Sequence, residues 1–132
     1  MKTVILENDS ELSDRLLTYL YENKILYEFI GMADRRQSEE IAELFSEHEI
    51  LIVEPTMLTF SQYNLMLMLM YDLLTKNKLK IKEVQFFDDV EDITDGLREL
   101  WEDKRMYLDQ VLKHVELFAI DKMSHEKIKL EI

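Results

Sequence analysis

Short apolar segments alternate with amphipathic helical segments along most of this chain. The segments 2–6, 25–32, 49–55 and 81–87 are mostly apolar and rich in β-branched or aromatic residues, as is typical of strands in a buried sheet. Between them, apolar residues recur every three or four positions, which indicates helices that bury one face. Parallel strands joined by right-handed helical crossovers satisfy this order. The sequence therefore predicts one α/β domain over residues 1–132, a three-layer sandwich of about five mostly parallel strands with helical crossovers.

Two of the predicted strands carry charged residues that place them at the margin of the sheet. Glu28 interrupts the segment 25–32, so we expect one face or one edge of that strand to be wet. Charged and apolar residues alternate in the segment 127–132, which predicts a final, half-exposed strand at a sheet edge.

A long helix is predicted between the strand at 81–87 and the end of the chain. Apolar residues keep a spacing of three or four from Val90 to Ala119. A helix of ~33 residues would be roughly 50 Å long, which is longer than a small sheet can cover. We therefore expect a break near Gly96 or at Lys104-Arg105, or else an end that projects.

The segment 59–77 is predicted to be a helix that is buried on more than one side. Thr59-Phe60-Ser61-Gln62 matches a capping box at its start, and residues 65–69 are apolar all the way round. Met66, Met68 and Met70 are flexible side chains that fill gaps in a core. The alternative is a homodimer seam, formed by this Met-rich helix or by the long C-terminal helix.

Composition excludes several classes of function. The chain has no Cys, and its 16 basic and 28 acidic residues give a net charge of −12. The absence of Cys removes disulfides and thiolate chemistry, and the charge disfavours direct binding to nucleic acid or to anionic membranes. The longest apolar stretch, 65–71, is far short of a membrane span, and no signal-peptide pattern is evident. We expect a soluble cytoplasmic protein.

Acidic residues follow three of the predicted strands. In a parallel sheet, ligands bind beyond the carboxyl ends of the strands, and clustered carboxylates recruit hard cations such as Mg²⁺. The candidate metal ligands are Glu7, Asp9, Glu54 and Asp88. The alternative is that Asp9, Asp88 and Asp89 cap the helices that follow them. Apart from this Mg²⁺ site, we expect no cofactor, because the sequence has no Gly-rich phosphate loop, no G-x-S-x-G motif and no pair of His at metal-ligand spacing.

The segment 83–103 holds nine acidic residues against one base, Arg98, for a net charge of −8. It forms either a solvated helix face or a surface that meets a basic protein partner, with association speeded by charge. The candidate partner-binding residues are Asp89, Glu91, Asp92, Asp95 and Glu99.

The first 60 residues resemble a response-regulator receiver domain. The match rests on Val4-Ile5-Leu6-Glu7-Asn8-Asp9, on the amphipathic helix after it, and on Ile50-Leu51-Ile52-Val53-Glu54-Pro55. The resemblance implies a receiver-like, flavodoxin-like or otherwise Rossmann-like fold. It places Glu7 and Asp9 near the acidic pair of that family and Glu54 at its phosphoryl-accepting aspartate.

Three departures from the family imply that this chain carries out no phosphotransfer. Glu54 replaces the aspartate, Asp88-Asp89 replaces the hydroxyl residue after the fourth strand, and no lysine follows the fifth strand when that strand is placed at 127–132. We therefore expect a non-catalytic regulatory or protein-interaction domain. The alternatives are a Mg²⁺-dependent phosphohydrolase or nuclease that uses the strand-end carboxylates, and an acidic inhibitor or immunity-type protein of a basic nucleic-acid-binding partner.

Overall fold

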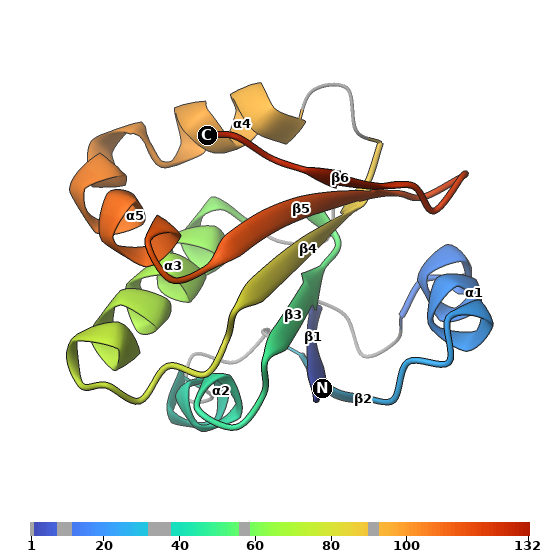
Figure 1. The fold of residues 1–132 in the computed structure, drawn as a ribbon, viewed down its shortest axis with the longest axis horizontal. Helices are drawn as coiled ribbons and strands as arrows, with labels where there is room; N and C mark the ends of the chain where they lie inside the picture. The colour runs from blue at the N-terminus through green and yellow to red at the C-terminus, as the bar shows by residue number, and fades with distance from the viewer. Residues whose placement is uncertain (1, 8–11, 32–37, 56–58, 90–92) are drawn as a thin grey trace.

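The computed structural model describes residues 2–7, 12–31, 38–55, 59–89 and 93–132. Strands and helices alternate along the chain until a final β-hairpin (Figure 1). The elements are β1 (Thr3–Glu7), α1 (Asp14–Glu22), β2 (Tyr27–Gly31), α2 (Ser38–Phe45), β3 (Ile50–Val53), α3 (Phe60–Thr75), β4 (Glu83–Asp88), α4 (Ile93–Leu100), the 3-10 helix η3 (Glu102–Lys104), α5 (Arg105–Leu112), β5 (Glu116–Asp121) and β6 (Lys127–Lys129).

The strands form one sheet in the order β2-β1-β3-β4-β5-β6. All neighbours are parallel except β5 and β6, which are antiparallel. The first five strands have the flavodoxin-like order 2-1-3-4-5. The predicted α/β fold with a mostly parallel sheet is therefore confirmed, and β1, β3 and β4 are neighbours, as the convergence of their acidic ends requires.

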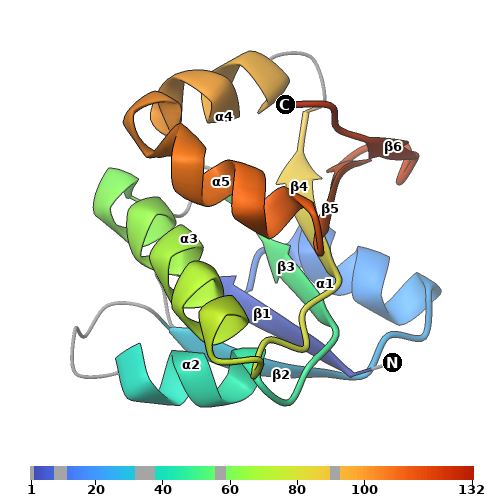
Figure 2. The same cartoon turned by 60° about the vertical axis from the view of Figure 1, so that its left-hand side comes forward.

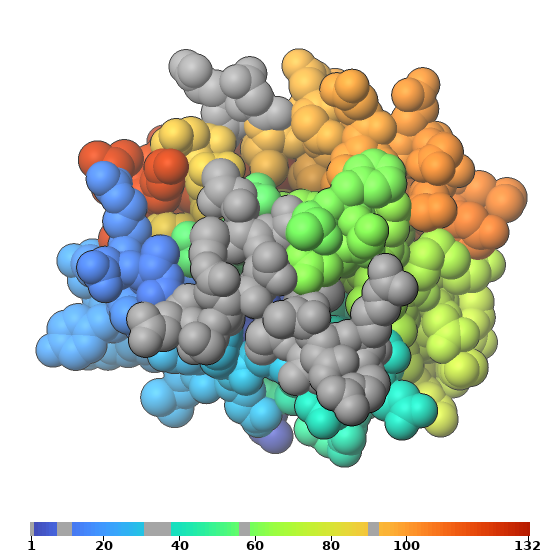
Figure 3. All heavy atoms as spheres, turned by 180° about the vertical axis from the view of Figure 1, so that it is seen from behind, coloured from blue at the N-terminus to red at the C-terminus, as the bar shows by residue number. Residues whose placement is uncertain are grey.

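The helices cover the two faces of the sheet unequally. Helix α1 lies on one face, where Leu16, Tyr19 and Leu20 pack against side chains of four strands. Helices α2, α3, α4 and α5 lie on the other face, over the larger core (Figures 1 and 2). The view from behind shows α4 and α5, in orange, beside the green α3 (Figure 3). This division follows from right-handed crossovers, because only the β1–β2 connection runs toward the β2 edge.

The predicted long helix, whose apolar spacing runs from Val90 to Ala119, is wrong in its second half. The chain breaks at η3, next to Lys104-Arg105, which is one of the two expected positions. Helix α5 ends at Leu112, and residues 116–121 form β5 between β4 and β6. This segment is apolar at four consecutive positions, Leu117 to Ile120, and a short apolar run of this kind has no period that separates a strand from a helix.

After β5, the chain forms a β-hairpin with β6. The predicted edge strand at the C-terminal end is β6, which is antiparallel to β5. Lys127 pairs with Glu83 at 2.9 Å and lies 4.3 Å from the centre of the Phe118 ring. Lys129 lies 3.5 Å from Glu116. These lysines cover the β4–β5 part of the α1 face with charged groups that suit contact with water.

Helix α3 has the predicted capping box. The Thr59 hydroxyl accepts a hydrogen bond from the backbone N–H of Gln62, and the Gln62 side chain accepts one from the N–H of Thr59. Met66 and Met70 are buried in the larger core and Met68 is half-buried. Core packing therefore explains Met66 and Met70. In the part of the chain that the structure describes, no helix is long and apolar enough to cross a membrane.

Candidate functional site at the carboxyl edge of the sheet

The candidate site lies where the chain direction across the sheet reverses. From β1 the sheet extends to β2 on one side and to β3 on the other, and this switch point is where flavodoxin-like folds bind ligands. Glu7 ends β1 and Glu54 follows β3, so both predicted carboxylates flank the switch point. Glu7 is fully buried and Glu54 is 7% exposed. Neither carboxylate is presented openly to solvent.

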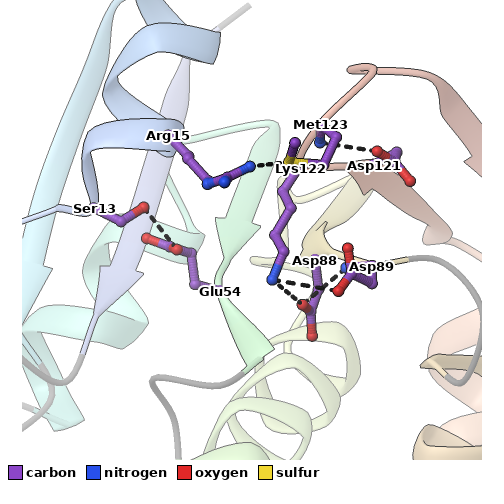
Figure 4. A network of polar contacts seen from close by, with 8 residues as sticks. All are labelled: Ser13, Arg15, Glu54, Asp88, Asp89, Asp121, Lys122 and Met123. Atoms are coloured by element: carbon purple, nitrogen blue, oxygen red, sulfur yellow. Dashed lines mark hydrogen bonds and ion pairs between the residues drawn. The ribbon is translucent and has the colours of Figure 1, made fainter.

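Ser13 connects Glu54 to the first helix by a hydrogen bond. The Ser13 hydroxyl donates a hydrogen bond of 2.8 Å to Oε2 of Glu54 and accepts one from the backbone N–H of Leu16 (Figure 4). The same side chain is therefore the N-cap of α1 and the partner of the carboxylate beyond β3. The alternative that Asp9 caps this helix is wrong, because its N-cap is Ser13.

A lysine does follow the fifth strand, contrary to the sequence-based expectation. Lys122 comes directly after β5, and its Nζ lies 3.6 Å from Oδ1 of Asp88 and 3.4 Å from Oδ2 of Asp89 (Figure 4). Its backbone N–H also donates to the carbonyl oxygen of Asp88. The sequence does not predict Lys122 at this edge, because the apolar spacing before it predicts a helix in place of β5.

Asp121 is a further acidic residue at this edge and was also missed. Its Oδ1 accepts hydrogen bonds of 2.8 Å and 2.9 Å from the backbone N–H groups of Met123 and Ser124. These bonds favour the charged form, so they hold the pKa of the Asp121 carboxyl below its usual value. The side chain of Met123, in turn, contacts the guanidinium of Arg15 on α1 (Figure 4).

Tyr63, in the first turn of α3, is a neutral group close to the acids. Burial raises the pKa of its phenol well above the usual value, and the charge of Asp88 raises it further. The hydroxyl is buried without a hydrogen-bond partner among the described residues. Tyr63 therefore stays protonated at physiological pH.

The predicted metal site is only partly within the described residues. Asp9 lies outside them. Within 2–7, 12–31, 38–55, 59–89 and 93–132, no group of three His, Asp or Glu side chains is placed to hold a metal ion. Glu54 faces Ser13, and Asp88 faces Lys122 and the backbone N–H of Asp89. The four-ligand Mg²⁺ site stays a prediction.

The predicted partner-binding acids are spread over the β4 end and α4. Asp89 is exposed and faces Lys122. Asp95 and Glu99 are exposed on α4, and Asp95 lies 3.6 Å from Arg98. Glu91 and Asp92 lie outside the described residues. Binding of a basic partner to these acids stays a prediction.

Comparison with known proteins found no match for this chain among protein-family models, among curated proteins or among solved structures. The receiver likeness therefore rests on the motifs in the sequence and on the order of the strands. Strand order defines the fold class and does not by itself define an activity.

Proposed function

We propose that this chain is a non-catalytic regulatory domain, receiver-like without phosphotransfer, which acts through contacts with another protein. The observation that supports this role is the state of Glu54, at the position of the phosphoryl acceptor. Its carboxylate is buried and bonded to the Ser13 hydroxyl. An acceptor has to meet a phosphoryl donor from solvent, and this side chain is shielded from solvent.

The other polar groups of the edge support the same role. Lys122 is held by Asp88 and Asp89 through two ion-pair contacts, and Asp121 is held by the turn between β5 and β6. The Ser13–Glu54 hydrogen bond links β3 to α1, and the contacts of Lys122 link β4 to the β5–β6 turn. The hydrogen bond to Ser13 fixes the Glu54 side chain in one arrangement, so this role requires no modification step at that position.

The absence of phosphotransfer is tested directly. The wild-type chain is incubated with acetyl phosphate and Mg²⁺, and its intact mass and melting temperature are measured. We expect no phosphoryl adduct and no thermal shift with millimolar Mg²⁺. A Glu54→Asp variant is the matched control, since it restores the residue type of the acceptor. An adduct on the wild type, or a metal-dependent shift that Glu54→Gln abolishes, contradicts the proposal and favours the Mg²⁺-dependent enzyme.

The regulatory role also predicts a partner whose binding depends on Glu54. Proteins that bind the immobilised wild-type chain are compared with those that bind Glu54→Gln, Glu54→Ala and the surface control Glu102→Gln. We expect at least one protein that binds the wild type and the control but binds both Glu54 variants at least about tenfold more weakly, a loss of about 1.4 kcal/mol. Equal binding to all four chains contradicts a role for Glu54 in the contact.

A further inference from the structure

Strand β2 is an open edge of the sheet. It pairs with β1 on one side, and no other described strand pairs with its outer side (Figure 1). Such an edge presents unpaired backbone N–H and C=O groups, which are a template for pairing with another chain. The sequence had predicted a wet face or edge here from Glu28, and the position of β2 agrees with that prediction.

The two edges of the sheet differ in protection. The opposite edge, β6, has three residues, two of them lysines, and a short, charged strand disfavours pairing with another sheet. Strand β2 has five residues, with neither lysine nor proline. Three large hydrophobic side chains in this region are exposed, Leu26 by 89%, Tyr27 by 40% and Phe29 by 36%. Among the described residues, the β2 edge is longer than β6 and has two exposed aromatic side chains, and its one charged residue, Glu28, lies 3.3 Å from His48.

We propose that β2 pairs antiparallel with β2 of a second copy of this chain, about a two-fold axis at Phe29. This register sets Phe29 opposite Phe29, Tyr27 opposite Gly31, and Glu28 opposite Ile30. Aromatic pairs stabilise a sheet across strands, and an aromatic ring covers the bare backbone of a glycine on the facing strand. In the register centred on Phe29, the Glu28 carboxylates of the two copies are apart. A register centred on Glu28 would set these two like charges opposite each other, which destabilises the pair.

The face on which the aromatic residues lie supports this pairing. Tyr27 and Phe29 are aligned with Thr3 and Ile5 of β1, and Ile5 belongs to the smaller core under α1. Aligned residues of neighbouring parallel strands share a face. The Phe29 pair therefore extends the core that has only one helix over it, and the two sheets become one continuous sheet with a closed, two-fold interface.

The charge of the chain gives this dimer a distinctive salt dependence. Each copy carries a net charge of −12, so two copies repel each other and salt screens the repulsion. The dimer is expected to tighten as NaCl rises from about 0.1 M to about 0.5 M. Binding of a basic partner to the acidic surface is expected to weaken as NaCl rises. The dimer does not depend on the proposed regulatory role, and either can fail alone.

Sedimentation equilibrium tests the pairing with two variants that repel themselves. At about 100 µM, the wild type is expected to be dimeric, and Phe29→Lys and Phe29→Glu are expected to be monomeric because each sets like charges on the axis. An equimolar mixture of the two variants is expected to restore a dimer. The control Met106→Lys changes a side chain that is 69% exposed on α5 and is expected to stay dimeric. A monomeric wild type, or a dimer that survives both Phe29 variants, overturns the proposal.

Disulfide crosslinking locates the axis without disturbing charge. The chain has no Cys, so Phe29→Cys introduces a single thiol that meets its own copy on the axis. Mild oxidation at low protein concentration is expected to crosslink most of this variant, whereas the control Met106→Cys stays uncrosslinked. Equal crosslinking of the two variants contradicts an axis at Phe29, even where the charged variants fail to fold.

Discussion

Ser13 is the residue through which the candidate site and the stability of α1 are joined. Replacing it with alanine removes the N-cap of α1 and leaves the buried Glu54 carboxylate without the Ser13 donor. We expect Ser13→Ala to lower the free energy of unfolding by about 1–3 kcal/mol, measured by urea denaturation. Ser13→Thr keeps both bonds and is expected to lose less than half as much. Equal stability of Ser13→Ala and the wild type contradicts the linking role.

Asp121 gives the edge an acid-sensitive group. Its pKa is lowered in the folded chain by the backbone N–H groups of Ser124 and Met123, so its contribution to stability is present above the unfolded pKa and is lost as pH falls through the folded value. In an NMR pH series that follows its carboxyl carbon, we expect the pKa of Asp121 to lie below the usual value of an aspartate. We expect Asp121→Asn to reduce the loss of stability between neutral pH and about pH 3. A titration midpoint at or above the usual value shows that the turn does not hold the carboxylate.

At this same scale, the sequence predicted one half of the site better than the other. Glu7, Glu54 and Asp88 lie at the ends of strands whose apolar runs are clear, so their position at one edge followed from the sheet order. Asp121 ends β5 and Lys122 follows it, and both were missed because this segment was predicted to be helical. The Ser13 contact joins positions 41 residues apart, and no local pattern reports such a contact.

At the scale of elements, β5 shows what a local pattern leaves open. Val111, Leu112, Val115, Phe118 and Ala119 fit a helical spacing. In the folded chain, Leu117 and Ala119 face the larger core and Ile120 faces the smaller one. The pairing of β5 with β4 on one side and β6 on the other decides the strand. The strands β4 and β6 come beside β5 only in the tertiary structure. The capping box of α3 involves residues three positions apart in the sequence, and it was predicted correctly.

Helix α4 carries a glycine in its interior that the fold does not need. A Cβ at Gly96 would meet no atom within 4 Å, and the helix runs from Ile93 to Leu100 around it. Alanine has a higher helix propensity and restricts the unfolded chain. We expect Gly96→Ala to raise the free energy of unfolding by about 0.4–1 kcal/mol, measured by urea denaturation. Gly96→Ser is expected to gain less, and a loss of stability in the alanine variant contradicts an open helix surface at this position.

For the whole molecule, the important asymmetry is between the two cores. Helices α2, α3, α4 and α5 share one apolar core with five strands, whereas α1 alone covers the other face through Leu16, Tyr19 and Leu20. The alternation of strands and helices predicted two covered faces. The unequal division of the helices follows from the strand order, which depends on all the crossovers together. The ion pairs of Lys127 and Lys129 lie on the part of the sheet face that α1 leaves open.

This asymmetry predicts that α1 opens before the rest of the molecule. Regions with few buried apolar contacts unfold locally at a lower free energy than the core. In native-state hydrogen exchange, we expect the α1 amides to exchange at a lower opening free energy than those of β4. Ser13→Ala is expected to lower the opening free energy of the α1 amides further. If α1 opens locally, the opening free energy of the α3 amides is expected to change less. If α1 and β4 exchange with one common free energy in both chains, α1 is part of a single cooperative unit, and the smaller core is as strongly coupled to the sheet as the larger one.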